Sequence, residues 1–131
     1  MKILVGYNGS DACKRALALA KQHAGSLQGK IEVVQAISRK EPLSYDRIEN
    51  AERLLAREVK NLLDGKAGSA EATLLVSSQS PGEQLINFAQ TIHAAEIIIG
   101  SKKRSKVGKF ILGSTTQYVV LNAPCPVVVV K

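Results

Sequence analysis

Residues 96–114 read EIIIGSKKRSKVGKFILGS, and this stretch decides how we expect the chain to fold. It opens with an apolar run, which predicts a strand buried on both faces over residues 96–99. Residues 100–113 follow as a loop that begins and ends with glycine and carries five Lys and Arg residues but no Asp or Glu. Ser114 is then expected to cap a helix over residues 115–122. A buried strand, a long loop and a helix in this order are typical of a parallel α/β sheet.

The rest of the chain repeats this alternation of strands and helices. Apolar runs predict further strands over residues 2–7, 31–37, 71–76 and 127–130, and apolar residues three and four positions apart predict helices over residues 11–22, 45–63 and 81–92. Gly25 and Gly29 are expected to break the first helix. Alternation of this kind predicts a five-stranded parallel sheet with helices on both faces, in a single domain over residues 1–131.

Two strand orders are common for such a sheet, 2-1-3-4-5 and 3-2-1-4-5, and the basic loop selects between them. In open α/β sheets a ligand binds beyond the carboxyl ends of the strands, where the strand order reverses. The first strand adjoins that point in either order, and only in the second does it face the strand that ends at Gly100. Loops longer than about 12 residues in a compact domain are usually functional. We therefore predict the order 3-2-1-4-5, with a site between residues 100–113 and the turn at residues 8–10.

The composition of this loop is typical of a phosphate-binding segment. Gly100 allows the chain to turn and a ligand to approach the backbone. At Gly113 and Ser114 a helix begins, so its free N–H groups and its dipole face the crevice, and the hydroxyl of Thr115 adds a donor. The lysines of the loop supply positive charge. The alternative is that Gly113 makes a tight turn, Ser114 is an ordinary cap and the lysines form a solvated face.

The composition of the chain excludes several classes of protein. With 45% hydrophobic and 22% charged residues the chain is expected to be ordered, and its two cysteines are too few for a disulfide framework. We find no spacing of metal ligands, no signal peptide and no run of 18 apolar residues, so we expect a cytoplasmic protein without a membrane span. The net charge of +7 lies largely in the basic loop. Because no aromatic residue is interleaved with the basic cluster at residues 102–106, we do not expect nucleic-acid binding.

Four segments resemble the universal stress protein family, and together they span the chain. They are Val5-Gly6-Tyr7-Asn8-Gly9-Ser10, residues 95–101, Gly113-Ser114 at the end of the family's glycine motif, and residues 123–130. The resemblance implies a Rossmann-like sheet of order 3-2-1-4-5, similar to that of the adenine nucleotide alpha hydrolases. It also implies a sensor or regulatory module of the stress response, in the cytoplasm, that binds ATP with or without Mg²⁺.

Carried over by position, the resemblance implies a set of nucleotide contacts. It places adenosine against Tyr7, Asn8 and Ala36, and ribose and phosphates against Ile99, Gly100, Gly113, Ser114 and Thr115. The second glycine of the family's motif falls on Lys103, whose side chain would either obstruct the backbone or reach a phosphate itself. The family's usual aspartate in the first turn is Asn8, an uncharged amide that would hold Mg²⁺ less firmly.

The sequence leaves two functions open. The alternative to a nucleotide-binding module is a nucleotide-free interaction protein whose basic loop binds acidic partners. No catalytic residues are predicted, since His23 and His93 stand alone and are interpreted as half-buried structural residues, although slow ATP hydrolysis remains open. Residues 127–130 form an apolar edge strand in the predicted order, so we expect a homodimer through that strand.

Overall fold

A five-stranded parallel sheet forms the centre of the computed structural model, which describes residues 1–63, 70–101, 103–104 and 108–131. Its strands are β1 (Lys2–Gly6), β2 (Lys30–Ser38), β3 (Ala70–Ser77), β4 (Glu96–Gly100) and β7 (Val127–Val130). They lie in the order β3-β2-β1-β4-β7, which confirms the predicted order 3-2-1-4-5. The chain is therefore an α/β protein of Rossmann-like topology.

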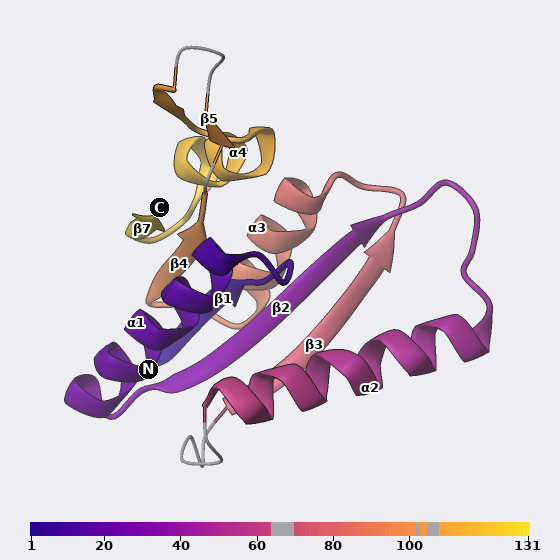
Figure 1. The fold of residues 1–131 in the computed structure, drawn as a ribbon, viewed down its shortest axis with the longest axis horizontal. Helices are drawn as coiled ribbons and strands as arrows, with labels where there is room; N and C mark the ends of the chain where they lie inside the picture. Colours follow the sequence, from indigo (N-terminus) through magenta and orange to yellow (C-terminus); the bar gives the residue numbers. More distant parts are fainter. Residues whose placement is uncertain (64–69, 102, 105–107) are drawn as a thin grey trace.

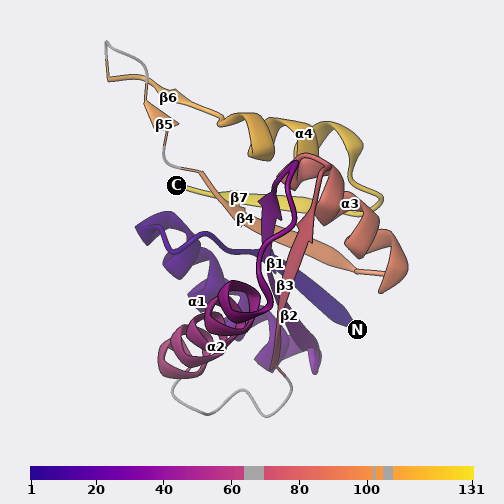
Figure 2. The ribbon, with the colours of Figure 1, turned by 90° about the vertical axis from the view of Figure 1, so that its right-hand side faces the viewer.

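Two helices cover each face of the sheet (Figures 1 and 2). They are α1 (Asp11–Leu27) and α2 (Tyr45–Leu62) on one face, and α3 (Pro81–Thr91) and α4 (Ser114–Asn122) on the other. Successive residues of β1 point to opposite faces, so Ile3 and Val5 join the core under α1 and α2 while Leu4 joins the core under α3. All three are fully buried. This double burial explains why β1 has an uninterrupted apolar sequence.

The strands end at different heights, and this leaves space at the carboxyl edge of the sheet. β1 pairs with β2 as far as Gly6 and Val34, and with β4 as far as Gly6 and Ile99. β2 continues to Ser38 with only β3 beside it. Beyond Gly6 the chain turns into α1, so a gap opens between the end of β2 and the end of β4.

The structure corrects the predicted end of the first helix and the predicted course of the basic loop. The first helix does not break at Gly25 but continues to Leu27, because one glycine costs a helix only about 1 kcal/mol relative to alanine. It ends at Gln28, which adopts a left-handed conformation (φ 52°) and donates its N–H to the carbonyl of Ala24. The basic loop contains a short antiparallel hairpin of β5 (Lys103–Arg104) and β6 (Phe110–Ile111), which lies beyond the end of β4 (Figures 1 and 2).

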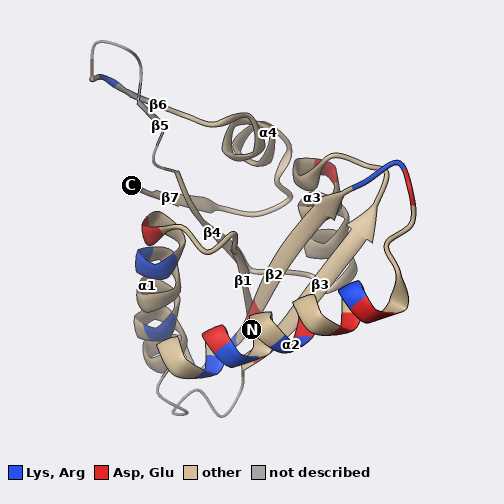
Figure 3. Cartoon of the chain, turned by 45° about the vertical axis from the view of Figure 1, so that its right-hand side comes forward, with Lys and Arg blue, Asp and Glu red and all other residues tan. Residues whose placement is uncertain are grey.

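The expected contacts between the basic loop and phosphates fall mostly outside the described residues. Lys102 and Lys106 belong to the parts that the structure does not describe, and only the backbone of Lys103 and Arg104 is described. The charged residues that are described gather mainly on the outer sides of α1 and α2 (Figure 3). Within the described ranges we find no helix long and apolar enough to traverse a bilayer.

One acidic residue, Glu32, is buried within β2, with only 4% of its surface exposed. Its partner in the register with β3 is Glu71, so two carboxylates lie on adjacent strands. Burial, followed by repulsion from Glu71, raises the pKa of Glu32, and Lys2 and Lys30 offset this only in part. The ionised carboxylate of Glu32 therefore opposes folding.

Replacement of Glu32 with glutamine is expected to raise the free energy of unfolding at neutral pH by roughly 0.5–1 kcal/mol, since it removes a cross-strand repulsion. Because the folded-state pKa is raised, the cost of the carboxylate is fully present above that pKa and fades as pH falls toward the unfolded value. Urea unfolding of both proteins at neutral and acidic pH tests this, with Glu52→Gln on α2 as the exposed control. A gain that is absent at neutral pH, or that grows in acid, contradicts the prediction.

Candidate functional site

A cavity of about 500 Å³ lies at the carboxyl edge of the sheet, where β1 separates β2 from β4. The structure brings eight of the nine predicted site residues to its wall, namely Tyr7, Asn8, Ala36, Ile99, Gly100, Gly113, Ser114 and Thr115. The ninth, Lys103, is described only by its backbone, and the role predicted for its side chain lies outside the description. The turn after β1 and the start of α4 therefore face the same space, as the sequence predicted.

The wall formed by β2 combines apolar side chains with free backbone groups. Val34 and Ala36 contribute apolar surface, and Leu85 of α3 adds to it. The carbonyl of Val34 accepts from the N–H of Tyr7 at 2.9 Å, so Val34 faces β1. In a parallel strand alternate residues face the same neighbour, and Ala36 therefore points its N–H and C=O to the same side, past the end of β1. A donor and an acceptor thus lie next to each other on this wall.

The opposite wall is the N-terminus of α4. Gly113 is the N-cap (φ −69°, ψ 163°), and no described side chain caps this helix. The prediction that Ser114 is the cap was wrong by one residue, because Ser114 already belongs to the helix. In contrast, serines cap α1, α2 and α3 by accepting backbone N–H bonds. The first turn of α4 therefore offers backbone N–H groups and the positive end of a helix dipole to the cavity.

Two polar residues that the sequence did not single out lie at this helix start, and one of them, Ser101, holds it in place. The backbone N–H of Gly113 donates to Oγ of Ser101 at 3.3 Å, and the N–H of Ser101 donates to the carbonyl of Val130 at 2.7 Å. Thr116, which is 4% exposed, lines the cavity one residue beyond Thr115. The three consecutive hydroxyl residues at 114–116 were a signal in the sequence from which the place of Thr116 could have been predicted. Ser101 carried no such signal, since its role depends on β7.

Comparison with known proteins agrees with this geometry. The sequence profile of the universal stress protein family matches residues 1–131. The chain belongs to the universal stress protein family. It is 33% identical over 138 residues to the universal stress protein in the QAH/OAS sulfhydrylase 3' region of Thermus aquaticus, with 98% of this chain and 97% of that protein covered.

Solved structures of the family share the fold of this universal stress protein. A universal stress protein from Archaeoglobus fulgidus superposes with a TM-score of 0.85 at 30% identity, covering 100% of this chain and 98% of that one. A universal stress protein from the same organism, solved in complex with dAMP, has a TM-score of 0.79 at 25% identity, again covering 100% and 98%.

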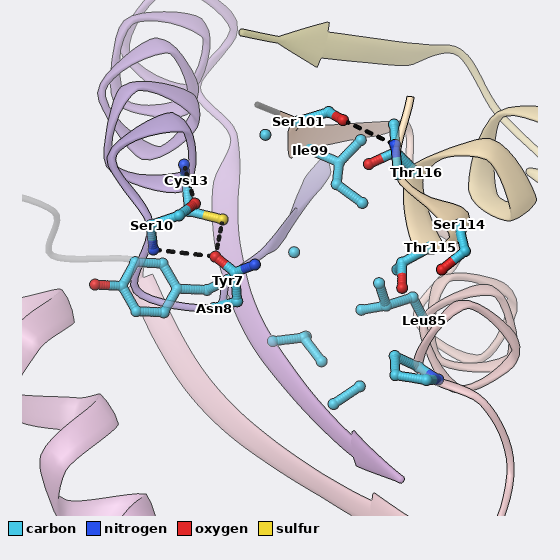
Figure 4. A pocket seen from close by; sticks show the side chains of 16 residues that line it. Tyr7, Asn8, Ser10, Cys13, Leu85, Ile99, Ser101, Ser114, Thr115 and Thr116 are labelled. Atoms are coloured by element: carbon cyan, nitrogen blue, oxygen red, sulfur yellow. Dashed lines mark hydrogen bonds between the residues drawn. The ribbon is translucent and has the colours of Figure 1, made fainter. Parts of the chain in front are cut away.

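Asn8 of this universal stress protein is fixed by hydrogen bonds within its own turn. Its Oδ1 accepts from the backbone N–H of Ser10 at 3.0 Å and from Sγ of Cys13 at 2.9 Å (Figure 4). The hydroxyl oxygen of Ser10 in turn accepts from the N–H of Cys13. Gly9 between them has a φ of +82°, which favours glycine. Cys13 is also part of the cavity wall.

Tyr7 reaches the cavity differently from the expectation that it contacts adenosine. Figure 4 shows its ring turned away from the cavity, and its hydroxyl donates to Oε2 of Glu58 in α2 at 3.0 Å. Burial, together with the hydrogen bond to Glu58 and its charge, raises the pKa of Tyr7 to about 12. The phenol therefore ties β1 to α2 rather than contributing to the site.

Replacement of Tyr7 with phenylalanine is expected to lower the free energy of unfolding by roughly 0.5–1.5 kcal/mol, the usual net value of one hydrogen bond. Any ligand bound in the cavity should keep its affinity within about twofold, since the lost hydroxyl faces α2. Denaturant unfolding and ligand titration of the same preparation separate the two quantities. A large loss of affinity at unchanged stability would show that the hydroxyl serves the cavity.

The histidines lie away from this site. Nδ1 of His23 is 2.7 Å from Oε1 of Glu96, which links α1 to β4 and agrees with the half-buried structural role expected for it. His93 is instead exposed and adopts a φ of +54° just after α3, so its expected half-burial was wrong. Among the described residues, no three His, Cys, Asp or Glu side chains gather as metal ligands.

Proposed function

We propose that this universal stress protein binds an adenine nucleotide in the cavity and acts as a sensor or regulatory module in the stress response. The observation that carries the proposal is that the cavity has the backbone N–H and C=O of Ala36 on one wall and the start of α4 on the other. An adenine edge presents a donor beside an acceptor, which complements Ala36. A phosphate complements the unpaired N–H groups and the dipole of α4.

In this arrangement the adenine ring lies among Val34, Ala36 and Leu85, and the phosphates lie at Ser114 and Thr115. The complex of an Archaeoglobus fulgidus family member with dAMP supports an adenine nucleotide as the ligand class. ATP is the member of this class that the family resemblance implies. Lys103, adjacent in the chain to β4, is proposed as a further phosphate contact.

Ligand-induced stabilisation tests the proposal. A nucleotide that binds only the folded state adds about 2.7 kcal/mol at a hundredfold excess over its Kd. We expect ATP, ADP or AMP to raise the melting temperature, whereas adenine-free ribose phosphate should not at the same concentration. If none of the nucleotides shifts the melting curve, with Mg²⁺ or with EDTA, the protein is better described as a nucleotide-free partner of acidic surfaces, whose association weakens with salt.

We also propose that two copies pair through β7, as the edge position of this strand suggests. The carbonyls of Pro126 and Val130 accept from β4, so the alternate residues Val127 and Val129 direct their backbone groups to the open edge. Leu121 of α4, close to β7 in the fold, is 74% exposed.

Val129→Pro removes one edge donor without removing a bond to β4, and light scattering should then find a monomer. An unchanged oligomeric state would overturn the pairing.

The two cysteines suggest where the protein acts. Cys13 and Cys125 are both free thiols, and Cys13 is buried. Unpaired cysteines are typical of reducing compartments. We therefore propose a cytoplasmic location, where adenine nucleotides are also abundant.

A further inference from the structure

The family resemblance leaves open whether Mg²⁺ accompanies the nucleotide, and the residues of this cavity do not suit that ion. Mg²⁺ is usually bound through one or two carboxylates together with phosphates and water. Within the described part of the chain, no Asp or Glu lines the cavity. The sequence from Gly100 to Gly113 also contains no acidic residue. The position where the family usually has an aspartate is occupied by Asn8.

The side-chain oxygen of Asn8 is already used within the protein. It accepts one hydrogen bond from the N–H of Ser10 and one from the thiol of Cys13, at 3.0 and 2.9 Å. An amide oxygen has two lone pairs, so no acceptor capacity is left for a cation. The opposite orientation of the amide would place its NH₂ group against the N–H of Ser10 and lose that hydrogen bond, so the observed orientation is favoured. Cys13 is only 2% exposed, so its thiol is held close to this partner.

The amide nitrogen of Asn8 is consequently the group that faces the cavity (Figure 4). An aspartate held by the same two donors would present a second, negatively charged oxygen there. This chain presents a neutral hydrogen-bond donor where such an aspartate would present an anionic acceptor. Compared with an aspartate, Asn8 does not attract a cation to this wall of the cavity. It favours a hydrogen-bond acceptor on the ligand, whereas an aspartate would favour a donor.

We infer that this protein binds its nucleotide as the metal-free anion, with Asn8 donating a hydrogen bond to an oxygen or nitrogen acceptor of the ligand. The inference rests on the proposed nucleotide function and specifies its ligand. Positive potential for the phosphates then comes from the first turn of α4 rather than from a cation held by the protein.

The test is calorimetric titration of ATP and AMP into the full-length protein, once in EDTA and once in millimolar Mg²⁺. For the wild type we expect Mg²⁺ to leave AMP affinity unchanged and to leave ATP affinity unchanged or weaker. In Asn8→Asp we expect ATP to bind about tenfold more weakly in EDTA and to regain affinity with Mg²⁺. Asn50→Asp, an exposed change of the same charge on α2, should behave as the wild type.

The outcomes separate the inference from the function on which it rests. If ATP binds the wild type about tenfold more tightly with Mg²⁺ than with EDTA, the inference is overturned while the nucleotide function stands. If Asn8→Asp and the wild type respond to Mg²⁺ alike, Asn8 has no part in the preference and the inference also fails. If neither nucleotide binds under either condition, the proposed function itself is wrong.

Two variants of Cys13 test the hydrogen bond that orients Asn8. Cys13→Ser keeps a donor to Asn8 and should retain the wild-type response of ATP affinity to Mg²⁺, whereas Cys13→Ala should weaken that response.

Discussion

Replacement of Gly100 with alanine is expected to destabilise this protein by about 3 kcal/mol or more, at the upper end of the usual cost of overpacking. A Cβ atom at this position would lie 2.5 Å from the carbonyl carbon of Ala12 and 2.6 Å from the backbone nitrogen of Cys13. Both are backbone atoms of α1, so no side chain can rotate to make room. Because domains are stable by only about 5–15 kcal/mol, the loss should appear as a large fall in melting temperature.

Gly25→Ala is the matched control for this experiment. Gly25 lies within α1, the helix that Gly100 approaches, and nothing lies within 4 Å of a Cβ atom at Gly25. That change should leave stability unchanged or raise it by roughly 0.5–1 kcal/mol, since alanine is the better helix former. A Gly100→Ala protein as stable as the wild type would mean that α1 does not pack on β4 as closely as described here.

Ser114→Pro is expected to abolish most nucleotide binding while leaving the fold intact. Proline is favoured at the first position of a helix, and Gly113 already has the extended backbone (φ −69°, ψ 163°) that a residue before proline requires. The substitution removes one N–H group from the helix start that faces the cavity. Hydrogen bonds to charged groups contribute about 1.5–3 kcal/mol, so affinity should fall by roughly ten- to a hundredfold.

Ser114→Ala separates the contributions of the backbone and the hydroxyl. It removes only the side-chain donor and should weaken binding less than proline does. The melting temperature of each unliganded variant, measured in parallel, shows whether the fold is retained. Nucleotide affinity that survives Ser114→Pro in a folded protein would mean that the phosphates lie elsewhere.

Most of the fold and the location of the cavity could be predicted from the sequence, because both follow from the run of apolar strands. Parallel strands bring their carboxyl ends to one edge, so the residues after Gly6 and Gly100 had to converge once the strand order was chosen. The choice of order came from the length and charge of residues 100–113. The topology is now confirmed by the structure.

The sequence did not reveal several contacts between segments that are distant along the chain. The ring of Tyr7 turns from the cavity because Glu58, 51 residues away, accepts its hydrogen bond. Gly100, predicted to allow the approach of a ligand, lines the cavity and is also required by the close backbone of α1. The N-cap of α4 is Gly113 rather than Ser114, and the N–H group of Gly113 is held by Ser101. Local sequence patterns cannot predict these contacts, because the contacts form only when the helices pack on the sheet.

We propose that one adenine nucleotide contacts the end of β2 and the start of α4 together. Amide chemical shifts of ¹⁵N-labelled protein, followed during titration with AMP in EDTA, report on both segments at once. We expect the signals of Ala36, Ser114 and Thr115 to move together and to saturate with a single Kd. Signals that stay in place at these three residues while AMP perturbs another part of the chain would contradict it.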